Sequence, residues 1–375
     1  MRVRVHFLAA LLAVVSIALG MLLLNPGPVT AAPTISRSVA PRPAPERCTA
    51  PAPTTAAGYQ AMFDAKNDDG WSGGDQAASL ALADGRVLWL FADTVQGAQR
   101  GRAYQAGSRM VHNSFLLQDG GCLTAVNGPN RTELIPNHAG GDWYWPVSAL
   151  VERGRLLVVV ARTTRTGPGS LDFRSVGSSV AVFTLGTGTP VFERLAAMPT
   201  TDAEYGAALA AQGGWTYVYG TNQVSGAFGR AVTLARVPSG SFLEPSAWRY
   251  WSGRQWTADP ARAALVVEAA PHGWSTSFSV VAQDGGFRFL TKVNDYLGST
   301  VASGTSGSAL PPKVLTAVAS YPSKQPGEVF YNPLAHPEAH LRGGGLLVTI
   351  CRNNLDPRRV QASADLYKPQ FFTVR

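Results

Sequence analysis

The sequence predicts an all-β protein, and more narrowly a five-bladed β-propeller. Beyond Gly58, apolar side chains alternate in short runs separated by glycine-rich turns, a pattern typical of antiparallel strands. One hairpin-like unit recurs five times, at residues 75–93, 145–162, 205–222, 275–292 and 336–353. Its turn glycines are 69, 60, 71 and 60 residues apart, at Gly85, Gly154, Gly214, Gly285 and Gly345. Such a spacing holds four short strands with their loops, which is one propeller blade.

Residues 1–31 have the pattern of an export signal. Arg2 and Arg4 precede an apolar stretch at residues 7–24, and Val29-Thr30-Ala31 offers a small-residue cleavage site. We expect cleavage. A retained anchor is the alternative, because the apolar stretch approaches the length of a membrane span. The segment therefore predicts a bacterial protein that is secreted or held at the cell surface.

Residues 32–57 are rich in Pro, Ala, Ser and Thr, as in Pro41-Arg42-Pro43-Ala44-Pro45. A segment of this composition cannot bury a core, so it is interpreted as an extended tether. Residues 58–375 are then expected to form the propeller as a single domain, since all-β domains of this length are common.

The three cysteines, Cys48, Cys122 and Cys351, fit an oxidising compartment and allow one disulfide. The favoured bridge is Cys48 to Cys122, which would tie the tether to the first repeat, and Cys122 to Cys351 is the alternative. No Cys/His cluster has the spacing of a zinc site. We expect neither a metal nor a cofactor.

The formal net charge is +8, but the arginines are scattered and form no basic run. A nucleic-acid partner is therefore not expected. The charge is interpreted as an aid to solubility. We expect a monomer that has no membrane contact apart from the N-terminal anchor, if that anchor is retained.

Two aspartates frame the first repeat and have no counterpart in the other four. Asp75 stands at the start of the first strand and Asp93 at the end of the second, so antiparallel pairing places them side by side. Their carboxyls would then lie about 5 to 9 Å apart, the separation used in glycoside hydrolysis. One would be kept ionised by hydrogen bonds or by a cation such as Arg162. The other would be protonated because of desolvation and its neighbour's charge, and the sequence does not assign the two roles.

The matching strand ends of all five repeats should converge on one funnel, which is a binding site by its geometry. Glu338 is the third candidate acid of this rim. Aromatic and polar side chains at the same positions are the candidate substrate-binding residues, since rings stack well on sugar faces. They are Trp143, Trp145, Arg162, Tyr205, Asn222, Trp274, Lys292, Tyr331 and His336.

The motifs themselves are similar to those of a known family. Gly73-Gly74-Asp75 with Ser79, followed by Leu88-Trp89-Leu90-Phe91 and Asp93-Thr94, resembles the opening of a secreted actinobacterial domain-of-unknown-function family. That family includes endo-D-arabinanases of glycoside hydrolase family 183. The resemblance extends to residues 143–146, 205–207, 217–220 and 331–338. It departs at Ala92, where a glycine is usual, and at Val147-Ser148.

This resemblance implies a five-bladed propeller in which an aspartate pair, here Asp75 and Asp93, cuts arabinofuranosyl linkages. Together with the residue pattern, it predicts a secreted glycoside hydrolase, endo-acting on a cell-wall or extracellular polysaccharide, with inversion favoured. A non-catalytic glycan-binding propeller is the alternative. A protein-interaction platform is a third hypothesis.

Overall fold

The computed structural model describes residues 47–375 except 170, 200, 225–228, 271–272 and 294–297. All described residues belong to one compact unit, Ala44–Arg375. The predicted export signal and residues 32–46 of the predicted tether lie outside the described residues. In the part of the chain that is described, no helix has the length and apolar character needed to cross a membrane.

Five antiparallel sheets follow one another along the chain, and we number them 1 to 5. Sheet 1 holds β2 (Ala78–Ala81), β3 (Val87–Phe91), β8 (Ser114–Asp119) and β9 (Cys122–Val126). Sheet 2 holds β10 (Trp143–Glu152), β11 (Arg155–Arg165), β12 (Phe173–Thr184) and β13 (Val191–Ala197). Sheet 3 holds β14 (Glu204–Gln212), β15 (Trp215–Gln223), β16 (Arg230–Pro238), β17 (Arg249–Trp251) and β18 (Trp256–Thr257), and β19 (Leu265–Val267) pairs with β16.

Sheet 4 holds β20 (Ser279–Gln283), β21 (Gly286–Val293), β22 (Gly298–Ser306) and β23 (Thr316–Pro322). Sheet 5 holds β24 (Glu328–His336), β25 (Leu346–Asn354) and β26 (Gln370–Val374). Two small sheets are formed by β1 (Gly73–Gly74), β4 (Thr94–Gln96) and β7 (Arg109–Val111), and by β5 (Gln99–Arg100) and β6 (Ala103–Tyr104). The helices are α1 (Ala56–Ala65) and α2 (Pro357–Ala362), with 3-10 turns at Pro129–Arg131, Pro245–Ala247, Pro260–Arg262 and Ala364–Tyr367 (η4).

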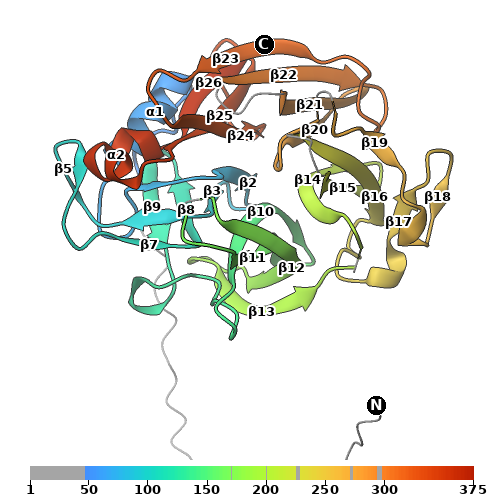
Figure 1. The fold of residues 1–375 in the computed structure, drawn as a ribbon, viewed down its shortest axis with the longest axis horizontal. Coiled ribbons are helices and arrows are strands. Elements are labelled where there is room, and N and C mark those ends of the chain that lie inside the picture. Colours follow the sequence, from blue (N-terminus) through green and yellow to red (C-terminus); the bar gives the residue numbers. More distant parts are fainter. Residues whose placement is uncertain (1–46, 170, 200, 225–228, 271–272, 294–297) are drawn as a thin grey trace, which may run out of the picture. The chain divides into compact units, whose positions relative to one another are not determined.

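The first strands of the five sheets form a closed ring. β2 contacts β10, β10 contacts β14, β14 contacts β20, β20 contacts β24, and β24 returns to β2. Figure 1 shows the sheets arranged around this centre, with later strands of each sheet farther out. This arrangement confirms the β-propeller fold. The count of five blades remains our interpretation of the five sheets.

The predicted hairpins form in all five sheets, and their five turn glycines have φ between +73° and +89°. The fifth hairpin differs from its prediction. We expected its first strand at residues 336–340, but β24 ends at His336 and residues 337–345 form a long loop before β25. Because the loop before Gly345 is long, the predicted hairpin placed the rim at His336. Phe330 and Tyr331, which pair with Arg352 and Cys351, occupy the rim instead.

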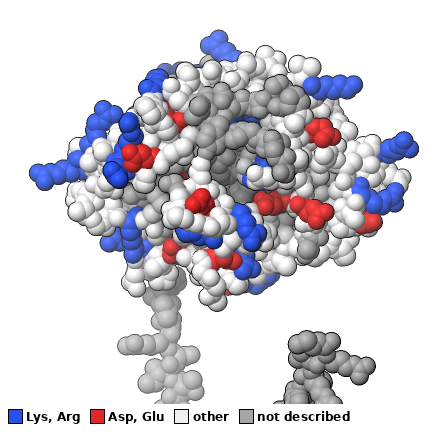
Figure 2. Space-filling model, viewed as in Figure 1, with Lys and Arg blue, Asp and Glu red and all other residues white. Residues whose placement is uncertain are grey.

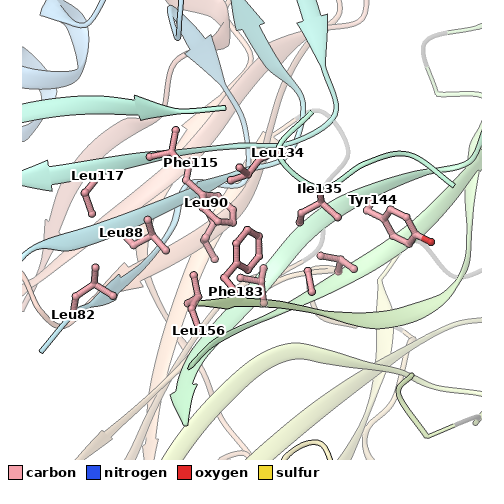
Figure 3. Close-up of a cluster of buried hydrophobic side chains, with 14 residues drawn as sticks. Leu82, Leu88, Leu90, Phe115, Leu117, Leu134, Ile135, Tyr144, Leu156 and Phe183 are labelled. Carbon is pink, nitrogen blue, oxygen red and sulfur yellow. The ribbon is translucent and has the colours of Figure 1, made fainter. Parts of the chain in front are cut away.

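Sheets pack on one another through apolar side chains. Figure 3 shows the cluster between sheets 1 and 2, where Leu88, Leu90 and Phe115 of sheet 1 meet Leu156 and Phe183 of sheet 2. All five are fully buried. Burial of each such side chain contributes roughly 1.5 to 3 kcal/mol, so this cluster holds the two sheets in a fixed relative position.

The inner strands are irregular just below one rim of the ring. Register shifts occur between Pro146 and Ser148 of β10, between Tyr205 and Ala208 of β14, and between Tyr331 and Leu334 of β24. Ahead of β2, Gln76 and Ala77 have φ of +74° and +52°. Positive φ is costly for residues other than glycine, and such strain is often found near functional sites.

Hydrogen bonds link these irregular segments from each inner strand to the next. In sequence around the ring they run from Asn332 Nδ2 to Gln76 Oε1 (2.8 Å), Gln76 Nε2 to the Val147 carbonyl (2.8 Å), Ser148 Oγ to the Gly206 carbonyl (2.7 Å), the Phe278 amide to the Ala207 carbonyl (3.4 Å), and the Ala335 amide to Ser279 Oγ (2.8 Å). We call this set the inner belt. It satisfies polar groups that the register shifts leave unpaired inside the ring.

The segment before the first sheet is more ordered than the sequence suggested. No helix was expected there, but Thr55 Oγ1 accepts a hydrogen bond from the Gly58 amide (3.0 Å) and caps α1. Tyr59 and Phe63 of α1 are buried. The disulfide joins Cys48 to Cys122, as favoured, and the Cys351 thiol is free and buried.

Candidate active site

A cavity of about 480 Å³ lies at the rim above the inner belt, and all five sheets or their loops line it. Figure 2 shows the hollow in the middle of this face, with acidic and basic side chains around it. Its lining includes two carboxyls, two cations, several aromatic rings and a group of amides. The lining includes Asp75, Gln76, Asp93, Trp145, Leu171, Phe173, Gln223, Arg230, Trp274, Lys292, Tyr331, Asn332, Asn353 and Tyr367.

The two aspartates lie side by side, as the hairpin predicted. The Asp75 amide donates to the Asp93 carbonyl (3.1 Å), and the Ala92 amide donates to the Asp75 carbonyl (3.1 Å). The chain then leaves the ladder through Gln76 and Ala77 before β2 begins. This backbone pairing fixes both carboxyls at the same rim.

The Asp75 carboxyl is largely buried, although Asp75 lines the cavity. Burial and the charge of Asp93 raise the pKa of Asp75 to about 7. The Tyr331 hydroxyl donates to Asp75 Oδ2 (2.8 Å) and lowers this pKa, as does the Tyr367 hydroxyl. Among the described residues, Asp75 Oδ1 has no hydrogen-bond partner of good geometry, although it is buried. An acid in this environment keeps a proton that it can give to a bound ligand.

Asp93 has a different environment. The Trp145 indole donates to Asp93 Oδ1 (2.7 Å), and His112 Nδ1 lies 2.8 Å from the same oxygen. The His112 ring stacks on Trp143, with centroids 4.6 Å apart and an interplanar angle of 21°. Because an indole N–H can only donate, Asp93 Oδ1 is an acceptor here. The stacked His112 holds the carboxyl in one orientation.

Apolar side chains form one wall of the pocket. Trp145 makes an edge contact with Phe173 at 4.8 Å, and Leu171 is 50% exposed beside them. Trp274 lines another part of the wall and packs on Phe278. Flat apolar faces beside polar groups suit the faces of sugar rings.

The structure brings six of the twelve predicted site residues to this pocket and leaves six outside its lining. Those in the lining are Asp75, Asp93, Trp145, Trp274, Lys292 and Tyr331. Those outside it are Trp143, Arg162, Tyr205, Asn222, His336 and Glu338.

Arg162 and Asn222 miss the pocket by one residue. Arg162 forms an ion pair with Asp142 (2.6 Å) and does not contact Asp93, and Asn222 Nδ2 donates to the Asp202 carbonyl (3.0 Å). Their chain neighbours Ala161 and Gln223 line the pocket instead. Since strand side chains alternate, an offset of one residue reverses the face on which a side chain lies.

Trp143 and Tyr205 belong to the packing of the sheets. Trp143 was expected to be exposed, but it is 5% exposed and lies behind His112. Tyr205 is 3% exposed and packs against Trp248 and Tyr250. Both positions favour the core because their neighbours are large rings.

His336 and Glu338 form a separate cluster with Ser79, which we call the axial cluster. Ser79 Oγ lies 2.5 Å from His336 Nδ1 and also hydrogen-bonds Glu338 Oε1. His336 Nε2 lies 2.9 Å from Thr349 Oγ1. Burial lowers the pKa of His336 to about 3 and raises the pKa of Glu338. The misplaced fifth strand explains why both were expected at the rim.

Several pocket or near-pocket residues were missed, among them His112, Phe173, Arg230 and Tyr367. His112 follows β7, outside every repeat, and Tyr367 ends η4 near the C-terminus. No sequence signal connects either one to Asp75 or Asp93. Phe173 and Arg230 each begin a third strand, a position that the hairpin pattern did not include.

Fold and pocket together define a β-propeller with a pair of unlike carboxyls in a cleft at one rim. The chain belongs to the family described as a domain of unknown function, DUF5005, which matches residues 57–375. This agrees with the expected membership in a domain-of-unknown-function family. A search of the curated proteins found no match.

Two solved structures are similar to the chain. The chain is similar to a protein from Bacteroides ovatus ATCC 8483, provisionally described as a hydrolase, with a TM-score of 0.68 and 20% identity over 85% of this chain and 89% of that one. It is also similar to an endo-arabinase from Bacteroides thetaiotaomicron VPI-5482, with a TM-score of 0.47 and 9% identity over 84% and 96%. The first likeness supports the fold.

Proposed function

We propose that the protein is a glycoside hydrolase and that Asp75 and Asp93 are its reacting carboxyls. The observation that carries this proposal is the contrast between two adjacent acids. Asp75 has a pKa raised to about 7 by burial and by Asp93, whereas Asp93 Oδ1 is an acceptor for Trp145 and lies against His112. Unlike environments for neighbouring titratable groups are the usual basis of an acid and base assignment.

In the proposed reaction, Asp75 gives its proton to the glycosidic oxygen while the bond from that oxygen to the anomeric carbon breaks. Asp93 takes a proton from a water molecule that attacks the anomeric carbon from the opposite face. The products are a sugar with an inverted anomeric centre and a free hydroxyl on the leaving chain. We favour this inverting course over a covalent intermediate on Asp93.

For the substrate, we propose internal arabinofuranosyl linkages of a cell-wall or extracellular polysaccharide. The support is the motif around Asp75 and Asp93, which resembles that of endo-D-arabinanases, together with a pocket lined from every sheet. The rings of Trp145 and Phe173 offer stacking surfaces. We further propose that the protein acts as a monomer outside the cytoplasm.

The test is a product screen with the purified protein on arabinans, galactans and wall extracts, read by chromatography of released oligosaccharides. We expect oligosaccharides from a furanose-containing polymer and a loss of about 10²- to 10⁴-fold in rate for Asp75→Asn and Asp93→Asn. Proton NMR of the first product reports the anomeric configuration. Binding of glycan by both variants and the wild type, with no product from any, would instead establish a non-catalytic glycan-binding protein.

A further inference from the structure

Arg230 has no ion pair with a described acid, unlike Arg162 and Arg352 near the same rim. Arg162 pairs with Asp142 (2.6 Å), and Arg352 pairs with Glu328 (2.7 Å). Arg230 lines the pocket, yet its guanidinium makes no hydrogen bond or ion pair with any described residue. It is nevertheless half-buried. Taking a charge out of water without a partner is costly, and a ligand anion would offset that cost.

The backbone of Arg230 is firmly placed. Its amide donates to the Trp274 carbonyl (2.9 Å), and the Trp274 amide donates back to the Arg230 carbonyl (3.0 Å). This bridge joins the start of β16 in sheet 3 to the segment before β20 in sheet 4. The side chain therefore starts from a fixed point in the pocket wall, beside a buried indole.

An amide accompanies the guanidinium. Gln223 is the register partner of Arg230 on β15, lines the same pocket, and makes no side-chain hydrogen bond with a described residue. Paired residues on adjacent antiparallel strands place their side chains on the same face. Burial lowers the pKa of the Arg230 guanidinium, while the charge of Glu204 acts in the opposite direction. Glu204 forms no ion pair with it.

We propose that Arg230 and Gln223 form an oxyanion subsite, and that the glycan of this pocket carries an acidic substituent, a carboxylate or a phosphate. This inference rests on the proposed function. A guanidinium binds either oxyanion through two parallel N–H donors, and a neighbouring amide N–H adds a third. Lys292 also lines this pocket and makes its charge more positive.

The position of the subsite has a consequence for substrate orientation. Arg230 belongs to sheet 3, whereas Asp75 and Asp93 belong to the hairpin of sheet 1. An acidic substituent near the aspartates would be repelled, and one at Arg230 would be attracted. The subsite would therefore fix the direction in which the polysaccharide crosses the pocket, with the cleaved bond at sheet 1 and the acidic substituent at sheet 3.

The test measures binding to an Asp93→Asn protein, which leaves the probes uncut. One probe is a glucuronate-bearing arabinoxylan oligosaccharide, compared with the same oligosaccharide after carboxyl reduction. The other is a phosphorylated arabinan oligosaccharide, compared with its phosphatase-treated form. We expect about tenfold tighter binding of at least one acidic probe than of its neutral match, a difference of about 1.4 kcal/mol. Salt should reduce it.

Three variants in this background sharpen the result. Arg230→Gln should abolish the preference and leave binding of the neutral probe within about threefold, whereas Arg230→Lys should keep part of it. Arg254→Gln removes the same charge from an exposed position outside the pocket and should keep all of it. Equal weakening of acidic and neutral probes by Arg230→Gln, or no acidic preference at all, would overturn the subsite.

Hydrolysis by the protein with Asp93 intact separates the two proposals. If the neutral probe is cut but acidity gives no advantage, the subsite fails and the proposed function stands. If acidic probes bind through Arg230 but nothing is cut, the subsite stands and the hydrolase proposal fails. If no probe is bound or cut, both fail.

Discussion

The protein contains two sites with a buried acid, the aspartate pair at the rim and the axial cluster between sheets 1 and 5, and they differ in what surrounds them. At the rim, Asp75 opens to a cavity of about 480 Å³ and lies beside a second carboxyl. In the axial cluster, Glu338 faces Ser79 and His336 and lies outside the lining of that cavity. Burial raises the pKa of both Asp75 and Glu338. A raised pKa alone therefore does not mark a site.

The rim differs from the axial cluster in two ways: its aspartates line a cavity, and the two carboxyls have unlike hydrogen-bond partners. Asp75 has one oxygen without a partner, whereas Asp93 has Trp145 and His112 against a single oxygen. The axial cluster is closed by contacts among its own members and with Thr349. The rim therefore has donor and acceptor groups free to bind a ligand. The polar groups of the axial cluster instead bind one another and Thr349.

The largest expected effect separates the roles of the two rim acids. Asp75→Asn should slow cleavage of a polysaccharide by about 10²- to 10⁴-fold. It should slow cleavage of an aryl arabinofuranoside far less, because a nitrophenolate leaves without a proton. Asp93→Asn should slow both substrates, since both need attack on the anomeric carbon. Rates on the two substrates, measured for both variants, check the assignment, and equal losses for Asp75→Asn on both would contradict it.

A smaller effect is expected from His112, a positioning residue that holds Asp93. His112→Ala removes the group 2.8 Å from Asp93 Oδ1 and the ring stacked on Trp143. We expect kcat to fall by about 10- to 100-fold with little change in KM, because misplacing a reacting group by about 1 Å has costs of this size. His138→Ala, outside the pocket, is the matched control. His112→Asn keeps a donor and should recover part of the rate, whereas a purely structural role would give parallel losses in thermal stability.

Tyr331 should change the pH profile more than the rate. Activity that needs a protonated Asp75 falls as pH rises through about 7. The Tyr331 hydroxyl stabilises the charged form of Asp75 and lowers its pKa, so Tyr331→Phe should move the alkaline limb to higher pH. A profile of kcat/KM against pH measures the shift. A limb that moves to lower pH, or does not move, would remove Asp75 from the role of acid.

The sequence could predict those features of the rim that follow from the repeated hairpin. A hairpin with aspartates at both free ends specifies their pairing, because antiparallel register follows from the turn. The repeat also located Trp145 and Lys292 in the pocket lining. These positions need only alternation and a turn glycine.

The rest depends on features without local periodicity. The register shifts in the inner strands have no signal in the repeat, and the lining contains Ala161 and Gln223 where Arg162 and Asn222 were expected. The long loop before Gly345 displaced His336 and Glu338 from the rim. His112 and Tyr367 reach the aspartates only through tertiary packing, so no pattern around them could have identified them.

The smallest expected effect on activity belongs to Glu338. Glu338→Gln keeps the size and an acceptor for Ser79, and we expect kcat/KM within about threefold of the wild type. Stability should change with pH instead. Because burial raises the pKa of Glu338 above its usual 4.5, the folded state binds its proton more tightly, and this stabilisation is lost as pH rises through the folded value. The glutamine variant cannot ionise and should lose less stability over that range.

His336 should affect stability at the acidic end of the same pH range, and it therefore provides a control for the Glu338 experiment. Its pKa is lowered from 6.5 to about 3, so its contribution is present above pH 6.5 and is lost as pH falls toward 3. Thermal unfolding from pH 3 to 9 should therefore show Glu338→Gln diverging from the wild type on the alkaline side while both share the acid limb. A different outcome would contradict this expectation: Glu338→Gln unfolds like the wild type at every pH but cleaves glycan a hundredfold more slowly. That result would place the axial cluster in the reaction and remove its distinction from the rim aspartates.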